Sequence, residues 1–104
     1  MKVAMHIIAK PPFVHFWTKY PEFEKPLRAF LSLLEGSKAQ NFNELKETFP
    51  SADYVPSKYT VFDIAGNGCR VVGTVQYGNQ QVYVQLVGTH KDYDIWTKKN
   101  RKKK

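Results

Sequence analysis

Cysteine is nearly absent from this 104-residue chain, whose single copy is Cys69. One cysteine cannot form a disulfide within the chain, and it leaves no CxxC pair for a metal site. The three histidines, His6, His15 and His90, are not spaced as zinc ligands, and the sequence has no HExxH motif. We therefore expect neither a metal nor another cofactor, and the free thiol favours a cytoplasmic location.

Long hydrophobic runs are absent as well. The opening segment 3–9 is apolar apart from one histidine, but Lys10 and Pro11 close it well short of a signal peptide or a membrane span. We expect no membrane association. Apolar residues still make up 42% of the chain and aromatic residues 14%, which is typical of a globular protein, and the length fits one domain.

The net charge of +7 is concentrated at the C-terminus. Six of the sixteen Lys and Arg residues lie between residues 98 and 104, and the other ten are balanced by nine acidic residues. We therefore expect one folded domain over residues 1–97 and a basic, flexible tail over residues 98–104. Such a tail is either solvated or attracts a polyanion through interactions that salt screens.

Hydrophobic spacing predicts three helices in the first half of the chain, after a short strand within residues 3–9. The first helix covers residues 12–20, and the second covers residues 22–36 with a glycine at its end. The third covers residues 41–49, with Asn43 as its candidate N-cap.

The second half of the chain shows the alternating pattern of strands. Three sets of residues at every second position can face one core: Thr60, Phe62 and Ile64; Val71, Gly73 and Val75; Val82, Val84 and Leu86. Short turns at residues 66–68 and 78–79 make these strands antiparallel neighbours. The expected fold is α+β, with N-terminal helices packed on one face of a small antiparallel sheet. Arg70 and Asp63 would share the other face, which we expect to be uncovered and concave.

Three residues near the end of this sheet are suited to phosphodiester chemistry. Cleaving RNA without a metal requires activation of a 2′-hydroxyl, charge stabilisation at the phosphate and protonation of the departing 5′-oxygen. The planar fork of Arg70 suits the phosphate, and imidazole or, less easily, phenol suits the proton transfers. His90 and Tyr93 are three residues apart, so a helical turn would direct both side chains to one side.

Each of these residues also has a structural interpretation. Arg70 could pair with Asp63 on the neighbouring strand, and His90 could form a local hydrogen bond where the strand ends. Tyr93 and Trp96, three residues apart, could anchor the C-terminal segment by packing. Composition and spacing leave these alternatives open.

Several motifs resemble those of the HigB family of type II toxins. Residues 61–72 read VFDIAGNGCRVV and residues 87–94 read VGTHKDYD. The family pattern is approximately V-F-(N/D)-I-G-G-N-x-x-R-(L/V)-V, then V-G-T-H-x-(E/D)-Y-D. Residues 49–53, FPSAD, and the segment 5–10 are also similar to the family. Ala65 stands where the family usually has the first glycine of its G-G-N turn.

The resemblance implies a RelE-like fold, because HigB toxins belong to the RelE/ParE superfamily. It implies an mRNA interferase, an endoribonuclease that cuts messages on the translating ribosome and needs no cofactor. It also implies a HigA-like helix-turn-helix antitoxin as partner. By this resemblance, Arg70 stabilises the charge of the phosphate, and His90 lies where relatives in the superfamily have a basic or imidazole side chain. Tyr93 lies nearby and stacks on the RNA or transfers a proton. Weaker candidates for RNA or ribosome contact are Asn67, which is also a turn residue, Lys91, Lys58, Lys46, His6 and Lys10.

Two other functions remain possible for such a chain. ParE-like relatives of the same fold inhibit DNA gyrase, but the phosphate-handling set around Arg70 favours RNA cleavage. A non-catalytic RNA-binding module is the other alternative, and the chain lacks the row of stacking aromatic residues expected of common single-strand RNA platforms.

Overall fold

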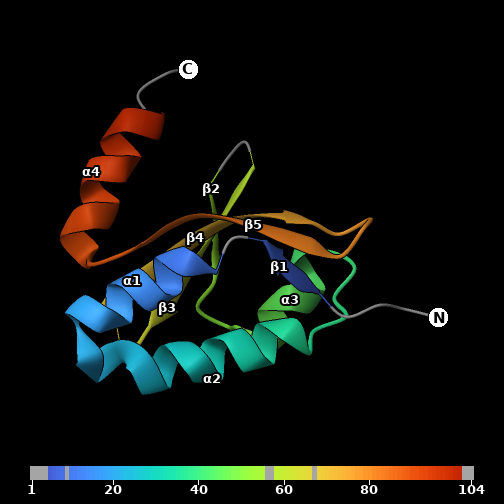
Figure 1. The fold of residues 1–104 in the computed structure, drawn as a ribbon. Coiled ribbons are helices and arrows are strands. Elements are labelled where there is room, and N and C mark those ends of the chain that lie inside the picture. Colours follow the sequence, from blue (N-terminus) through green and yellow to red (C-terminus); the bar gives the residue numbers. More distant parts are fainter. Residues whose placement is uncertain (1–4, 9, 56–57, 67, 102–104) are drawn as a thin grey trace.

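The chain has an α+β arrangement in which helices dominate the first half and strands the second. The computed structural model describes residues 5–8, 10–55, 58–66 and 68–101. The elements in order are β1 (His6–Ile8), α1 (Pro11–Lys19), the short 3-10 helix η1 (Pro21–Phe23), α2 (Glu24–Glu35), α3 (Phe42–Thr48), β2 (Asp53–Val55), β3 (Tyr59–Ile64), β4 (Cys69–Gln76), β5 (Gln81–Gly88) and α4 (His90–Arg101). Helices α1, α2 and α3 lie on one side of the sheet, and α4 rises on the other side at one end (Figure 1).

The five strands form one sheet in the order β1-β5-β4-β3-β2. Strands β2 to β5 pair antiparallel, as predicted, but β1 pairs parallel with β5 through the register Ile7 to Val82. The expected α+β fold is confirmed, whereas the prediction of a purely antiparallel sheet is wrong for its edge. Parallel pairing is possible there because a long connection through all three N-terminal helices separates the two strands.

Helix α2 forms because its apolar residues recur on one stripe. Leu27, Phe30, Leu31 and Leu34 are buried along that stripe, and Pro26 is tolerated because it lies in the first turn, where its missing N–H has no helical partner. The predicted terminal glycine, Gly36, is the C-cap.

Helix α3 begins with a reciprocal cap. The Asn41 side chain accepts a hydrogen bond from the Glu44 N–H at 2.9 Å, and the Glu44 carboxylate accepts one from the Gln40 N–H at 2.7 Å. The prediction of Asn43 as N-cap is therefore wrong. Asn41 takes that place because Glu44 then stands three residues further on, where its carboxylate can return to the start of the helix.

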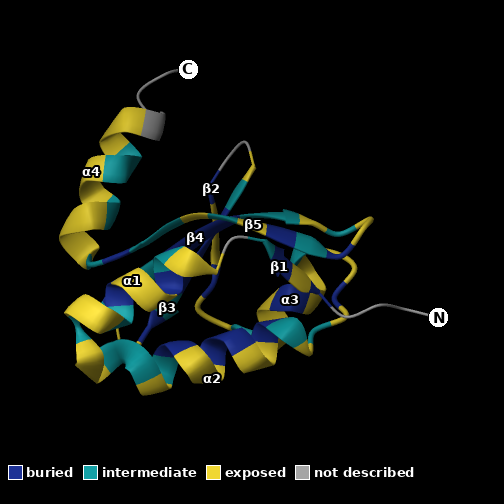
Figure 2. Cartoon of the chain, viewed as in Figure 1, coloured by how far each residue is buried: buried dark blue, intermediate teal, exposed yellow. Residues whose placement is uncertain are grey.

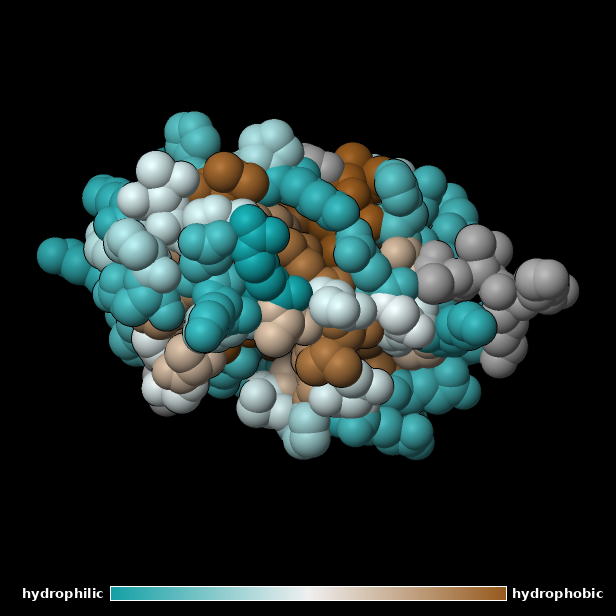
Figure 3. All heavy atoms as spheres, turned by 60° about the horizontal axis from the view of Figure 1, so that its bottom comes forward, coloured by the Kyte–Doolittle hydropathy of each residue, from teal (hydrophilic) through white to brown (hydrophobic). Residues whose placement is uncertain are grey.

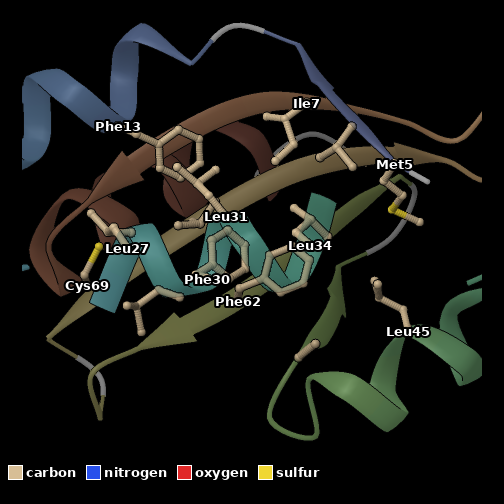
Figure 4. Close-up of a cluster of buried hydrophobic side chains, with 14 of the residues drawn as sticks. Met5, Ile7, Phe13, Leu27, Phe30, Leu31, Leu34, Leu45, Phe62 and Cys69 are labelled. Atoms are coloured by element: carbon tan, nitrogen blue, oxygen red, sulfur yellow. The ribbon is translucent and has the colours of Figure 1, made fainter. Parts of the chain in front are cut away.

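The main core lies between α1, α2 and α3 and the sheet. Figure 2 shows buried residues on the facing surfaces of these layers. Figure 4 shows Phe13, Leu27, Phe30 and Phe62 directed toward one another beneath the sheet. The outer surface on the side of α2 is mostly hydrophilic, with hydrophobic side chains appearing in patches between polar ones (Figure 3).

A β-bulge changes which side chains of β5 reach this core. Val72 pairs with Leu86, but the next residue, Gly73, pairs with Val84, so Gln85 is an extra residue on β5. Val82 and Val84 pack against the main core as predicted, whereas Leu86 packs on the opposite face of the sheet. The prediction for Leu86 is wrong because the bulge shifts the alternation by one residue.

The two hairpin turns use left-handed backbone at unexpected positions. Ala65 and Gly66 have φ of 54° and 60°, and Gln80 has φ of 55°. The buried Gln80 side chain donates hydrogen bonds to the carbonyls of Ala39 at 2.7 Å and Tyr77 at 3.0 Å, which holds its turn against the loop before α3. Asn67, the predicted turn residue, lies outside the described residues.

The C-terminal basic segment begins inside a helix. Helix α4 continues through residue 97 to Arg101, and residues 102–104 lie outside the described part of the chain. Within the described ranges, no helix is both long enough and apolar enough to cross a membrane.

Candidate active site around Arg70

The sheet face opposite the main core carries a second, smaller cluster beneath α4. Its buried members are Val55, Val61 and Val72, and Tyr59, Leu86, Tyr93 and Trp96 pack against them. The expectation of an uncovered face is therefore wrong at this end of the sheet. The aromatic side chains of α4 cover it, because the outer faces of β3 and β4 are themselves apolar and gain from burial.

Arg70 lies on this face, as predicted, between a carboxylate and an aromatic ring. Its partner across β3 is Asp63, with Nε 2.9 Å from Oδ1, and its guanidinium carbon is 4.7 Å from the centre of the Tyr93 ring. Only 17% of the Arg70 side chain is exposed. The ion pair suggested as an alternative is thus confirmed, and it fixes the direction of the guanidinium plane together with the ring.

An aromatic row continues from Arg70 along α4. Tyr93 stacks on Trp96 with ring centroids 6.1 Å apart. Trp96 and Tyr59 make a T-shaped contact with ring centroids 4.8 Å apart. The ammonium of Lys58 lies 5.7 Å from the Tyr59 ring centre. Tyr93 and Trp96 therefore do anchor α4 by packing, and in doing so they bring Tyr93 against Arg70.

Helix α4 starts with a capping box that our sequence interpretation missed. The Thr89 hydroxyl accepts from the Asp92 N–H at 3.2 Å, and the Asp92 carboxylate accepts from the Thr89 N–H at 3.0 Å. The signal was present as a Thr followed three residues later by an Asp. This box fixes where α4 leaves the sheet, and hence where His90 and Tyr93 lie.

His90 is the first residue of α4 and lies two residues beyond Gly88, the residue that pairs with Arg70 on β5. Its side chain is 58% exposed, with Nε2 4.0 Å from an oxygen of Asp94. The structure thus brings Arg70 and Tyr93 into contact, whereas the exposed side chain of His90 lies near Asp94.

The weaker candidates are spread over the molecule. Lys91 is exposed on α4, and Lys58 stands at the far end of the aromatic row. His6 is exposed on β1, at the other edge of the sheet. Lys10 forms an ion pair with Glu35, and Lys46 is exposed on α3, which lies on the opposite side of the sheet (Figure 1). The sixth candidate, Asn67, is outside the described residues.

Cys69 has no nucleophilic role at this site. Burial raises the pKa of the Cys69 thiol to about 12, so it stays protonated near neutral pH. Among the residues that the structure describes, no three His, Cys, Asp or Glu side chains gather as a metal would require.

Comparison with known proteins gives a family for this arrangement. A family model described as "HigB_toxin, RelE-like toxic component of a toxin-antitoxin system" matches residues 23–96. The mRNA interferase toxin HigB of Escherichia coli K12 is 34% identical over 101 residues, which cover 95% of this chain and 97% of the relative. The mRNA interferase HigB of Escherichia coli O6:H1 is 29% identical over 102 residues, which cover 96% of this chain and 99% of the relative. The resemblance noted in the sequence is confirmed, and the chain belongs to the HigB family of RelE-like toxins of toxin-antitoxin systems.

Proposed function

We propose that this toxin is an endoribonuclease that cuts messenger RNA on the translating ribosome by metal-independent attack of a 2′-hydroxyl. The observation that carries the proposal is Arg70, held on the outer sheet face between Asp63 and the Tyr93 ring. The relatives described above are named as mRNA interferases, which is the same activity. A HigA-like antitoxin is its expected partner, and the cytoplasm is its expected location.

In the proposed reaction the 2′-oxygen forms a bond to the adjoining phosphorus, and the bond from phosphorus to the 5′-oxygen breaks. The products are a 2′,3′-cyclic phosphate and a 5′-hydroxyl end. The proton of the 2′-hydroxyl leaves to one side chain, and a second side chain gives a proton to the 5′-oxygen. No oxidant, water or metal is consumed.

Arg70 stabilises the charge that collects on the non-bridging oxygens in this step. A guanidinium in a partly dry site does this better than a solvated one, because its charge is less screened and its direction is already fixed. Asp63 now binds the Nε side of Arg70, and it aligns the fork while the phosphate binds. The Tyr93 ring packs against the guanidinium group of Arg70 and restrains its orientation.

His90 and Tyr93 supply the two proton transfers. The imidazole of His90 is exposed at the start of α4, two residues beyond the strand partner of Arg70, so it is accessible to a substrate. The phenol of Tyr93 belongs to the ring that packs against the Arg70 guanidinium, so it lies close to where the phosphate would bind.

The test is Arg70→Ala, assayed by primer extension on messages from cells and from a reconstituted translation system. We expect cutting to fall roughly 100- to 1,000-fold, the usual loss when a transition-state charge contact is removed. Cleavage at the wild-type rate by a folded Arg70→Ala protein would contradict the proposal. Intact messages together with loss of DNA supercoiling in the wild type would instead indicate gyrase inhibition.

Arg28 provides a matched control on the other side of the molecule. It also pairs with a carboxylate, Glu24, at 2.8 Å, and also stacks on an aromatic ring, Trp17, at 4.7 Å. Arg28→Ala therefore removes the same kinds of contact without touching the proposed site. We expect this variant to cut messages as the wild type does.

A further inference from the structure

A cleft of about 580 Å³ lies between α1, the last part of β5 and the start of α4. Pro12 and Phe16 of α1 and Val87 of β5 form apolar walls, and His15, Lys19 and Gln85 bring polar groups to its lining. Figure 1 shows α1 running close to β5 where α4 begins. The volume is within the range of about 300–1,000 Å³ that is usual for sites of small ligands or single nucleotides.

The cleft adjoins Arg70 across one residue, Gly88. Arg70 and Gly88 are direct partners between β4 and β5, so their Cβ directions lie on the same face of the sheet. A Cβ at Gly88 would lie 2.7 Å from Cβ of Asp92, which places the Asp92 side chain on that face. Since Asp92 also lines the cleft, the cleft and the Arg70 site are neighbours on one surface.

The polar lining is suited to a nucleotide. His15 and Lys19 are one helical turn apart on α1 and both are exposed, so both can turn toward a phosphate in the cleft. The Lys19 ammonium lies 5.5 Å from the centre of the Tyr20 ring, which offers an aromatic wall beside the charge. Asp92 adds a carboxylate, but this group already accepts a hydrogen bond from the N–H of Thr89.

The bulge in β5 gives the cleft a group that can read a base. Gln85 is the residue that the bulge inserts, and its amide nitrogen lies 3.5 Å from the Thr74 hydroxyl on the outer face. A side-chain amide can both donate a hydrogen bond to a base edge and accept one from it. Proteins usually recognise the sequence of single-stranded RNA through such hydrogen bonds. Bulges beside functional sites commonly redirect one side chain in this way.

We propose that this cleft is a nucleotide-binding subsite that holds the RNA nucleotide next to the phosphate at Arg70. Lys19 and His15 bind its phosphate, the apolar walls with Tyr20 hold its base, and Gln85 selects among bases. The inference rests on the proposed function for the identity of the ligand, but its test measures binding and does not depend on cleavage.

The experiment measures binding of a short, fluorescently labelled, single-stranded RNA of mixed sequence to the full-length chain by anisotropy. Lys19→Gln should weaken binding about fivefold at 0.1 M salt, because one phosphate contact on a single strand carries a salt slope of about 0.7. His15→Gln combined with Lys19→Gln should weaken it further. Lys38→Gln, an exposed lysine between α2 and α3, is the matched control and should bind as the wild type.

Two further measurements locate and characterise the contact. RNA containing 4-thiouridine should cross-link, on irradiation, to the peptide that spans residues 11–20. Gln85→Ala should change which RNA sequences are bound, because Gln85 is the group that contacts the base edge in the proposed subsite.

The outcomes separate the two proposals. If the cleft variants bind RNA as tightly as the wild type and message cutting persists, the subsite is overturned and the nuclease stands. If the wild type cuts no message but the cleft variants lose RNA, the subsite stands and the nuclease is overturned. If RNA binding is unchanged and co-purification of the antitoxin is lost, the cleft binds the protein partner and the subsite is overturned.

Discussion

At the scale of single residues, Ala65 has a strained backbone conformation. It has φ of 54° in the β3–β4 turn, where a side chain crowds its own backbone and glycine is preferred. The family motif has glycine at this position, so the chain carries a side chain at a turn position whose left-handed φ favours glycine.

We predict that Ala65→Gly raises the free energy of unfolding by about 0.5–1 kcal/mol, because relief of the left-handed strain exceeds the extra entropy of glycine in the unfolded chain. Urea unfolding of the two proteins measures the difference. Gly66→Ala is the mirror control: Gly66 has φ of 60° and no atom within 4 Å of a new Cβ, so only backbone strain is added. That variant should lose a similar amount, and equal stability of all three proteins would contradict the argument.

Residue chemistry predicted much of the site, but not how it is covered. Strand alternation placed Arg70 and Asp63 correctly on the outer face, and the structure shows them paired. Packing of Tyr93 and Trp96 was one of the sequence interpretations, but their contact with Tyr59 and their cover over the face of Arg70 were not predicted, because two aromatic residues in an otherwise polar helix give little amphipathic signal.

At the scale of elements, the capping box of α4 determines the geometry of the site. Thr89 and Asp92 satisfy each other's backbone N–H groups at the point where β5 ends. The direction in which α4 leaves the sheet then places Tyr93 against Arg70. Loss of the cap should therefore affect the active site more than its distance from Arg70 suggests.

We predict that Thr89→Ala destabilises the protein by about 1 kcal/mol, the usual cost of a lost N-cap side chain. Amide hydrogen exchange in the first turn of α4 should accelerate, and message cutting should decrease. Thr97→Ala is the matched control, since the Thr97 hydroxyl donates to the Tyr93 carbonyl at 2.7 Å, a bond within the helix. Unchanged exchange in Thr89→Ala would show that packing of Tyr93 and Trp96 alone fixes the helix.

Long, periodic elements were predictable at this scale and local irregularities were not. The stripe of α2 and the pairing of β3, β4 and β5 followed from spacing. The bulge at Gln85 did not, because residues 82–86 continue to alternate in sequence while the pairing shifts. The same bulge supplies the Gln85 side chain to the cleft. The irregularity that the sequence pattern did not predict is therefore part of the proposed subsite.

At the scale of the whole molecule, two layers of packing and one charged helix define the surface available to RNA. The main core occupies the side of α1, α2 and α3, and the smaller cluster under α4 occupies the other side. Helix α4 is anchored by its first half, and its later half extends away from the sheet (Figure 1); this later half includes Lys98 and Lys99, which are exposed. The fold thus holds the proposed active site near the sheet and places part of the basic charge of α4 beyond it.

We predict that replacing the six Lys and Arg residues of segment 98–104 by Gln reduces the salt dependence of ribosome or RNA binding while cleavage of bound message continues. The rest of the chain holds ten basic and nine acidic residues, so this segment carries most of the long-range attraction. If all six contact phosphates, the slope of log affinity against log salt should fall by about 4. Glutamine preserves helix propensity, so the anchor at Tyr93 and Trp96 should persist. Equal slopes for the two proteins would show that the segment is solvated and that Arg70 and its neighbouring cleft supply the electrostatic attraction alone.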